Sequence, residues 1–201
     1  MAVVATAAMS GMRAEPGAAL AIGLGANLPT PLGDPCNTLV AARPALCQLI
    51  ESWAGAVCEL CWSPLFRTAP LGGPPDQPDY LNAAVLVAAP LQPSVAKARE
   101  LLAALHQLEL RFGRERLERW GPRTLDLDLL WWGELRCARP ELQLPHPRWH
   151  QRGFVVAPLL AIEHRWGAAL PVPAGFAPLE NLLAASEDAP PQQITTALLG
   201  W

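Results

Sequence analysis

The sequence is compatible with an α+β fold, because its expected elements follow the order strand, helix, strand, strand, helix, strand. Of the 201 residues, 51% are hydrophobic and 16% are charged, which is a globular composition. Apolar side chains recur at helical spacing over residues 93–111, and apolar runs bounded by glycine and proline indicate strands. We therefore expect one domain over residues 19–201, after a flexible extension over residues 1–18.

The first strand is expected over residues 18–24 and ends at the turn Gly25-Ala26-Asn27-Leu28. A Gly-x-Gly pair at positions 23 and 25 also occurs in dinucleotide-binding loops. Here Leu28 occupies the place of the third glycine, and no acidic residue follows at the required distance. The sequence therefore argues against a dinucleotide-binding fold.

A helix is expected over residues 37–53, with Pro44 as an interruption or a late start. Residues 56–66 are rich in Val, Leu, Cys and Trp and predict a second strand region. Proline and glycine then dominate residues 66–84, where neither a helix nor a sheet ladder can run through. A loop of this length in a compact domain is often a binding loop. Residues 82–88 continue as a third strand.

The second helix is expected over residues 93–111, with Ser94 as its cap. A short arginine-rich segment follows its end and holds five of the fifteen basic residues: Arg111, Arg114, Arg116, Arg119 and Arg123. Glutamates at 109, 115 and 118 are interleaved with them, which is typical of a salt-bridged solvated face. Because a carboxylate pair follows directly, we favour a phosphate-binding loop.

The carboxylate pair is Asp126 and Asp128, in an apolar run that follows the turn at Gly121-Pro122 and predicts a strand over residues 125–132. Alternate residues of a strand share one face, so these carboxylates lie on one side with Cα atoms about 6.8 Å apart. An Asp-x-Asp pair on a solvated strand is common. Two neighbouring carboxylates nevertheless suit a hard cation such as Mg²⁺, which shares oxygen ligands with phosphates, and the Arg123 guanidinium suits phosphate oxygens.

The remaining chain carries three histidines, and two of them, His146 and His150, are four residues apart. Pro147 disfavours the helix that a zinc site with this spacing needs, so we do not expect zinc. The apolar residues 155–162 should pack beneath the site, and a helix over residues 179–185 should close the core.

Net charge and cysteine content restrict the class of protein. A formal charge of −3 and a pI near 5.8 argue against a general nucleic-acid binder. Five scattered cysteines make no disulfide framework and indicate reduced thiols in the cytoplasm. No segment reaches transmembrane length without charges or prolines. We expect a monomer with small-molecule partners and neither nucleic-acid nor membrane partners.

Residues 119–130 closely resemble the signature of the 6-hydroxymethyl-7,8-dihydropterin pyrophosphokinase family, in which a basic residue, Gly-Pro-Arg and Asp-aliphatic-Asp follow at fixed spacing. Three further segments are similar to the family: the turn at 25–28, the loop at 66–84 and the Pro-His-Pro region at 144–154. The resemblance covers roughly residues 19–166. It implies a ferredoxin-like sandwich, with helices on the faces of a mainly antiparallel sheet, and transfer of pyrophosphate from MgATP to the pterin in folate biosynthesis.

The resemblance also implies roles for individual residues. The pterin would contact Thr68, Leu71, Tyr80, Asn82, Trp120 and Phe154, and ATP would contact Glu109, Arg114, Arg123, Leu129, His146 and Arg152. The catalytic set would be Arg114, Arg123, Asp126 and Asp128, with Asp126 and Asp128 holding two Mg²⁺ ions. One departure is His106, which occupies the place of a family glutamine, while Gln107 follows one position later.

Two other classes of function stay open. An RNA-binding module of similar fold would use the arginines, but the acidic pI and the lack of an RNP-like aromatic strand count against it. A Mg²⁺-dependent phosphohydrolase would also use carboxylates and arginines. The loop over residues 68–82 distinguishes the two enzymes, because a simple hydrolase has no need of a pterin pocket.

Overall fold

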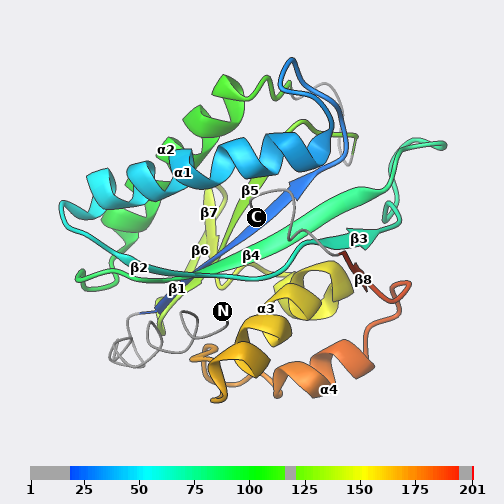
Figure 1. Cartoon of the computed structure of the whole chain (residues 1–201). Coiled ribbons are helices and arrows are strands. Elements are labelled where there is room, and N and C mark those ends of the chain that lie inside the picture. Colours follow the sequence, from blue (N-terminus) through cyan, green and yellow to red (C-terminus); the bar gives the residue numbers. More distant parts are fainter. Residues whose placement is uncertain (1–18, 116–120, 195–200) are drawn as a thin grey trace, which may run out of the picture.

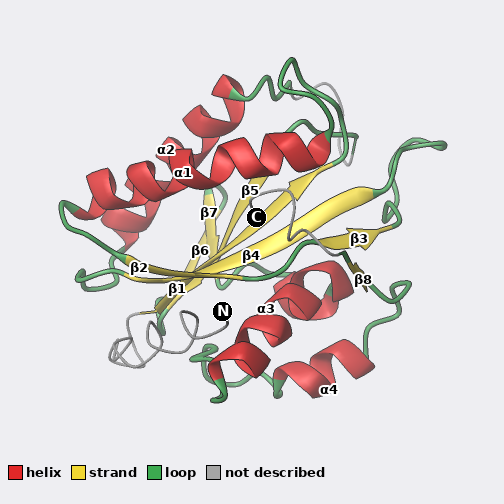
Figure 2. Ribbon diagram, in the orientation of Figure 1, coloured by secondary structure: helices red, strands yellow, loops and turns green. Residues whose placement is uncertain are grey.

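The computed structural model describes residues 19–115, 121–194 and 201, so the extension expected over residues 1–18 lies outside the described part. An antiparallel sheet lies between two layers of helices (Figures 1 and 2). Helices α1 (Pro35–Ala54) and α2 (Val95–Arg111) cover one face. Helices α3 (Gly153–Trp166) and α4 (Leu179–Ala184) cover the other face. The α+β prediction is confirmed.

The strands of the main sheet follow the order β5-β1-β4-β3-β8, and β2 also pairs with β4. Their bounds are β1 Ala19–Ala26, β2 Glu59–Trp62, β3 Phe66–Thr68, β4 Tyr80–Ala88, β5 Asp126–Trp132 and β8 Gln192–Gln193. A separate hairpin joins β6 (Cys137–Arg139) to β7 (Leu142–Leu144), and a short 3₁₀ helix, η2 (Trp149–Gln151), precedes α3. If β2 and β3 are counted as one interrupted strand, the order of the strands β5, β1, β4 and β2/β3 is that of the expected ferredoxin-like sandwich.

The predicted strand over residues 56–66 is interrupted where Pro64 lies between β2 and β3. Proline has no N–H group to donate to a neighbouring strand, so the ladder cannot continue through it. Ser63 still pairs with β4, because its amide donates to Ala84 O and its hydroxyl accepts from Ala84 N, both at 2.9 Å. Strands β2 and β3 therefore pair with the same strand, β4, on either side of Pro64.

Helix α1 runs through Pro44 without the predicted interruption. The helix begins two residues earlier than expected, where the Asp34 carboxylate accepts a hydrogen bond from Asn37 N at 2.9 Å. Pro44 lies on the exposed face, while Leu39 and Ile50 on either side of it are buried in the same core. Packing of both halves against the sheet therefore outweighs the lost helical hydrogen bond.

Three further segments agree with the sequence predictions. Helix α2 follows Ser94, whose hydroxyl accepts from Lys97 N at 3.3 Å as the predicted cap. The apolar residues 155–162 form the middle of α3, and all of them except residue 161 are buried. Helix α4 covers nearly the residues expected to close the core.

The two faces of β1 carry side chains of different size. Leu20, Ile22 and Leu24 belong to the core beneath α1 and α2. The alternate residues on the opposite face are Ala19, Ala21, Gly23 and Gly25. Small residues at the centre of the sheet leave space between β1 and the start of α3, and the candidate site occupies this space.

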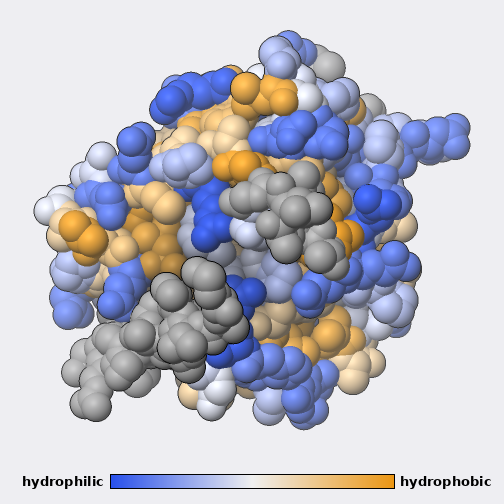
Figure 3. All heavy atoms as spheres, viewed as in Figure 1, coloured by the Kyte–Doolittle hydropathy of each residue, from blue (hydrophilic) through white to orange (hydrophobic). Residues whose placement is uncertain are grey.

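The outer surface is mixed in character. In Figure 3, hydrophilic residues interleave with separate hydrophobic patches across the face in view. Among the described helices, none is both long and apolar enough to cross a membrane.

Candidate active site

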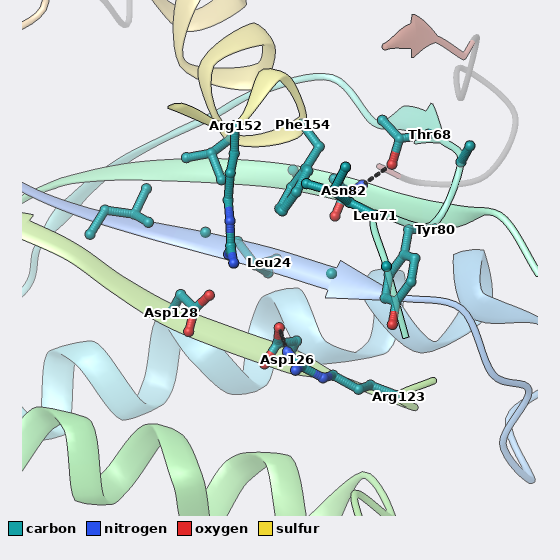
Figure 4. Close-up of a pocket in the computed structure, with 17 residues that line it drawn as sticks. Leu24, Thr68, Leu71, Tyr80, Asn82, Arg123, Asp126, Asp128, Arg152 and Phe154 are labelled. Carbon is teal, nitrogen blue, oxygen red and sulfur yellow. Dashed lines mark hydrogen bonds and ion pairs between the residues drawn. The ribbon is translucent and has the colours of Figure 1, made fainter. Parts of the chain in front are cut away.

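A pocket lies between the strands β1, β4 and β5, the loop after β3 and the first turn of α3 (Figure 4). Its lining includes residues predicted from three separate segments of the sequence: Thr68, Leu71, Tyr80, Asn82, Arg123, Asp126, Asp128, Arg152 and Phe154. Arg152 and Phe154 point from the start of α3 toward the sheet, and Asp126 and Asp128 lie below them on β5. The fold thus brings nine of the predicted site residues into one pocket, whereas Glu109, Arg114, Leu129 and His146 are not part of its lining.

The register of the sheet arranges the pocket floor in rows. Gly25 of β1 lies opposite Asp126 of β5 on one side and opposite Asn82 of β4 on the other. Gly23 lies opposite Asp128 in the next row on the same face. The sequence analysis did not identify these glycines as site residues. Their alternation within a strand was the available signal, because it gives one face without side chains.

Asp126 lies between two arginines. Arg114 Nη1 is 2.6 Å from Asp126 Oδ1, and the Arg123 guanidinium pairs with Oδ2 of the same carboxylate. Arg114 also pairs with Glu109 of α2, whose carboxylate accepts a hydrogen bond from Leu127 N at 2.8 Å. Glu109 is only 1% exposed. Its carboxylate therefore ties α2 to β5 and orients Arg114, rather than lining the pocket.

Asp128 carries the most perturbed carboxyl group of the pocket. Burial raises its pKa to about 7, and the neighbouring Asp126 carboxylate adds to the shift. Both aspartates supply oxygen atoms on one face of β5, which suits a hard divalent cation. Within residues 19–115 and 121–194, no group of three or more His, Cys, Asp or Glu side chains could hold a metal ion alone. A cation here would need further ligands from substrate and water.

Asn27 fixes the turn that carries Arg123. Its Oδ1 accepts from Arg123 N at 2.7 Å, and its backbone N–H donates to Arg123 O at 2.9 Å. Its Nδ2 donates to Pro78 O in the loop before β4 at 3.1 Å. Asn27 is 1% exposed, so this side chain links β1, the Arg123 turn and the loop from the inside. The turn at 25–28 was predicted only as a segment similar to the family, with no role for Asn27.

The Arg123 guanidinium remains charged in this environment. Burial lowers its pKa, but the Asp126 carboxylate outweighs that effect and the net pKa is raised. A permanent positive charge is thus fixed next to the start of β5.

The opposite end of the pocket has an aromatic and amide character. Asn82 Nδ2 donates to Thr68 Oγ1 at 2.8 Å between two buried side chains, and the Tyr80 hydroxyl donates to Gly121 O at 3.1 Å. Phe154 projects from α3, with the Arg152 Cζ atom 5.3 Å from its ring centroid. Two aromatic rings and a polar edge are suited to a flat heteroaromatic ring.

His146 lies beside the pocket as a neutral group. Its backbone N–H donates to Leu130 O at 2.7 Å, which fixes it next to β5. Burial lowers its pKa to about 4, and the positive charges of Arg152 and Arg148 add to the shift. Its Nδ1 accepts from Arg148 N at 3.3 Å, so the proton of the neutral ring is on Nε2.

Other predicted residues are not brought into the pocket lining. The Leu129 side chain packs in the core toward α1 and α2, on the face of β5 opposite Asp128. His106 and Gln107 lie on α2, away from the described lining. Trp120, with the neighbouring Arg116 and Arg119, lies outside the described residues.

Comparison with known proteins gives the family. Residues 21–164 match the family model for 7,8-dihydro-6-hydroxymethylpterin-pyrophosphokinase. A Synechocystis protein named 2-amino-4-hydroxy-6-hydroxymethyldihydropteridine pyrophosphokinase is 39% identical over 145 residues, covering 72% of this chain and 66% of that protein. Proteins of the same name from Haemophilus influenzae and Pseudomonas aeruginosa are 40% and 41% identical, over 70% and 69% of this chain and 79% and 76% of their own lengths. The chain therefore belongs to the 7,8-dihydro-6-hydroxymethylpterin-pyrophosphokinase family.

Proposed function

We propose that this protein transfers pyrophosphate from MgATP to the hydroxymethyl group of 6-hydroxymethyl-7,8-dihydropterin, giving AMP and the pterin diphosphate for folate synthesis. The observation that carries the proposal is the row formed by Asp126, Gly25 and Asn82 across three strands. A carboxylate and an amide thus share one face, separated only by a residue without a side chain. In the proposed reaction the carboxylate would hold a Mg²⁺ ion that binds phosphate, and the amide would bind the pterin. Family membership supports the same reaction.

The pterin would bind at the aromatic end. Tyr80 and Phe154 offer ring faces for stacking, and Asn82 and Thr68 offer groups that can donate and accept at the pterin edge. Leu71 lies in the loop at the pocket rim and is 56% exposed, so a bound ring would cover it. This binding mode directs the hydroxymethyl group toward β5.

ATP would bind at the charged end. Arg114, Arg123 and Arg152 would pair with phosphate oxygens, and His146 would donate through Nε2. A neutral histidine can donate at physiological pH without adding to the positive charge of the arginines. Asp126 and Asp128 would hold two Mg²⁺ ions, with the remaining ligands supplied by phosphate and water.

The chemical step would then depend mainly on position and charge. Two bound cations would supply charge neutralisation and would lower the pKa of the pterin hydroxyl. Arg114, Arg123 and Arg152 would stabilise charge on the transferring group, and the stacked pterin would hold its hydroxyl in line with the β-phosphorus. No described side chain needs to act as a general base in this scheme.

We also propose that the enzyme works as a monomer in the cytoplasm on small molecules alone. All five cysteines are free thiols, which supports a reducing compartment.

Product analysis tests the proposed function. The wild-type protein is mixed with MgATP and the hydroxymethyl pterin, beside Asp126→Ala and Asp128→Ala, and AMP and pterin diphosphate are quantified. Glu180→Ala is the control, because it removes an exposed carboxylate from α4. We expect both products from wild type and control and neither from the aspartate variants. Formation of ADP or free phosphate without the pterin would instead indicate a phosphohydrolase.

A further inference from the structure

Residues 186–194 lie beyond the family-matched part of the chain and return to the main sheet. Strand β8 pairs with β3, with Gln192 opposite Arg67 and Gln193 opposite Phe66. Ile194 N then donates to Leu65 O at 2.9 Å. The segment is thereby fixed to the edge strand that leads into Thr68 and the pterin loop.

The same segment contacts the first turn of α3. Asp188 Oδ2 accepts a hydrogen bond from Gly153 N at 2.7 Å. Arg152 is the N-cap residue of α3, but its side chain makes no capping hydrogen bond. The first amides of a helix lack internal acceptors, and a carboxylate there also meets the positive end of the helix dipole. Asp188 thus acts as the cap of α3, supplied from 35 residues further along the chain.

The contact between this segment and α3 is close. A Cβ atom at Gly153 would lie 3.0 Å from Ser186 Oγ and 3.5 Å from the Asp188 Cβ, which leaves no free space. Ser186 Oγ also accepts from Asp188 N at 3.3 Å and holds the local turn. The backbone of Asp188 therefore lies between two anchored points of the chain, the Ser186 turn and the paired strand β8.

This cap lies next to two residues of the pocket. Arg152 immediately precedes Gly153, and Phe154 immediately follows it; both line the pocket. The carbonyl of Arg152 accepts from Val155 N and Val156 N at 3.0 Å, so the orientation of the first turn determines where both side chains point.

We propose that Asp188 is a positioning residue, which orients Phe154 for the pterin and Arg152 for the triphosphate by capping α3. This inference rests on the proposed function for its substrates. It assigns a role in the site to a segment outside the residues that match the family.

Three single variants test the role. Asp188→Ala removes the acceptor, Asp188→Asn keeps an oxygen acceptor, and Glu187→Ala removes the exposed neighbouring carboxylate as the control. For Asp188→Ala we expect the KM for pterin to rise about 5- to 10-fold, comparable to the loss of a helix cap. Asp188→Asn should stay within about twofold of wild type and Glu187→Ala should equal it. Equal KM values for wild type and Asp188→Ala would overturn the proposal.

A double-mutant cycle with Phe154→Ala separates positioning from general loss of stability. If Asp188 acts through Phe154, adding Asp188→Ala to Phe154→Ala should raise the pterin KM much less than it does in wild type. Full additivity of the two effects would contradict the mechanism.

Amide hydrogen exchange tests the cap without turnover. We expect exchange at residues 153–156 to accelerate in Asp188→Ala and not in Asp188→Asn. Unchanged exchange would refute the cap even in an active enzyme. Faster exchange in Asp188→Ala, combined with a wild-type protein that makes no pterin diphosphate, would support the cap while refuting the proposed function.

Discussion

Gly25 on β1 lies directly opposite Asp126 on β5, and its lack of a side chain leaves the Asp126 carboxylate open to the pocket. The same glycine faces Asn82 on its other side. One small residue at the centre of the sheet therefore lies between the carboxylate end and the amide end of the pocket.

Substitution of Gly25 should selectively weaken pterin binding. In Gly25→Ala the new methyl group would lie 3.0 Å from Asn82 Oδ1, so Asn82 must shift and its bond to Thr68 is disturbed. We expect pterin affinity, measured by fluorescence titration, to fall about tenfold. In the matched variant Gly23→Ala, the nearest atom is Leu130 Cδ2 at 3.5 Å, which is ordinary contact. A larger affinity loss in Gly23→Ala would contradict this explanation.

Asp128→Asn should abolish activity and yet stabilise the metal-free protein. The folded pKa of Asp128 is raised to about 7, whereas the unfolded chain keeps the ordinary pKa of an aspartate. The folded protein therefore loses stability progressively as the pH rises from that ordinary pKa toward 7. At pH 8 without divalent cations, we expect the variant to unfold with a free energy about 2 kcal/mol higher than wild type. The difference should disappear near pH 4, and turnover with MgATP should fall about 100-fold or more. Urea unfolding at both pH values measures the stability difference, and a more stable wild type at pH 8 would rule it out.

Asn27→Ala should cost both stability and activity. It removes the buried acceptor of Arg123 N and the donor to Pro78 O, and unpaired buried groups of this kind cost about 1–3 kcal/mol. Because the Arg123 turn loses its anchor, the KM for ATP should rise as well. Asn37→Ala removes an exposed asparagine from α1 and should change stability by no more than about 0.5 kcal/mol. Equal unfolding free energies for the two variants would show that Asn27 is not an anchor.

His146 should make the protein less stable in mild acid. Its folded pKa of about 4 lies below the ordinary value of 6.5, so the unfolded chain takes up a proton first and stability falls as pH drops between these values. From pH 7.5 to pH 5.0 this group should account for about 2 kcal/mol of lost stability. Urea titrations at both pH values measure this loss of stability. In His146→Gln the loss should be smaller than in wild type by about the same 2 kcal/mol. In His164→Gln, which removes an exposed histidine, the loss should equal that of wild type. An identical pH dependence in His146→Gln and wild type would exclude this role.

Local patterns in the sequence predicted some features and missed others. The period of two along a strand correctly placed Asp126 and Asp128 on one face, and helical spacing correctly placed α2. The pairing of Gly25 with Asp126 depends on the register between strands that are 101 positions apart, which no local pattern encodes. The break at Pro64 had a local signal, but the apolar run around it outweighed that signal in the prediction.

Charge balance in the pocket has a consequence for how the co-substrate is loaded. Among the described residues, Arg123 and Arg152 line the pocket with Asp126 and Asp128, and the Arg114–Glu109 pair lies directly beside Asp126, so three guanidinium groups are gathered with three carboxyl groups. A lone divalent cation would give this cluster a net positive charge, and a free triphosphate would give it a net negative charge. A nucleotide that already carries its cations is nearly neutral and disturbs it least. On the proposed function, the resting pocket would therefore favour a preassembled, charge-compensated nucleotide, and its guanidinium groups would exchange one anionic partner for another as that nucleotide binds.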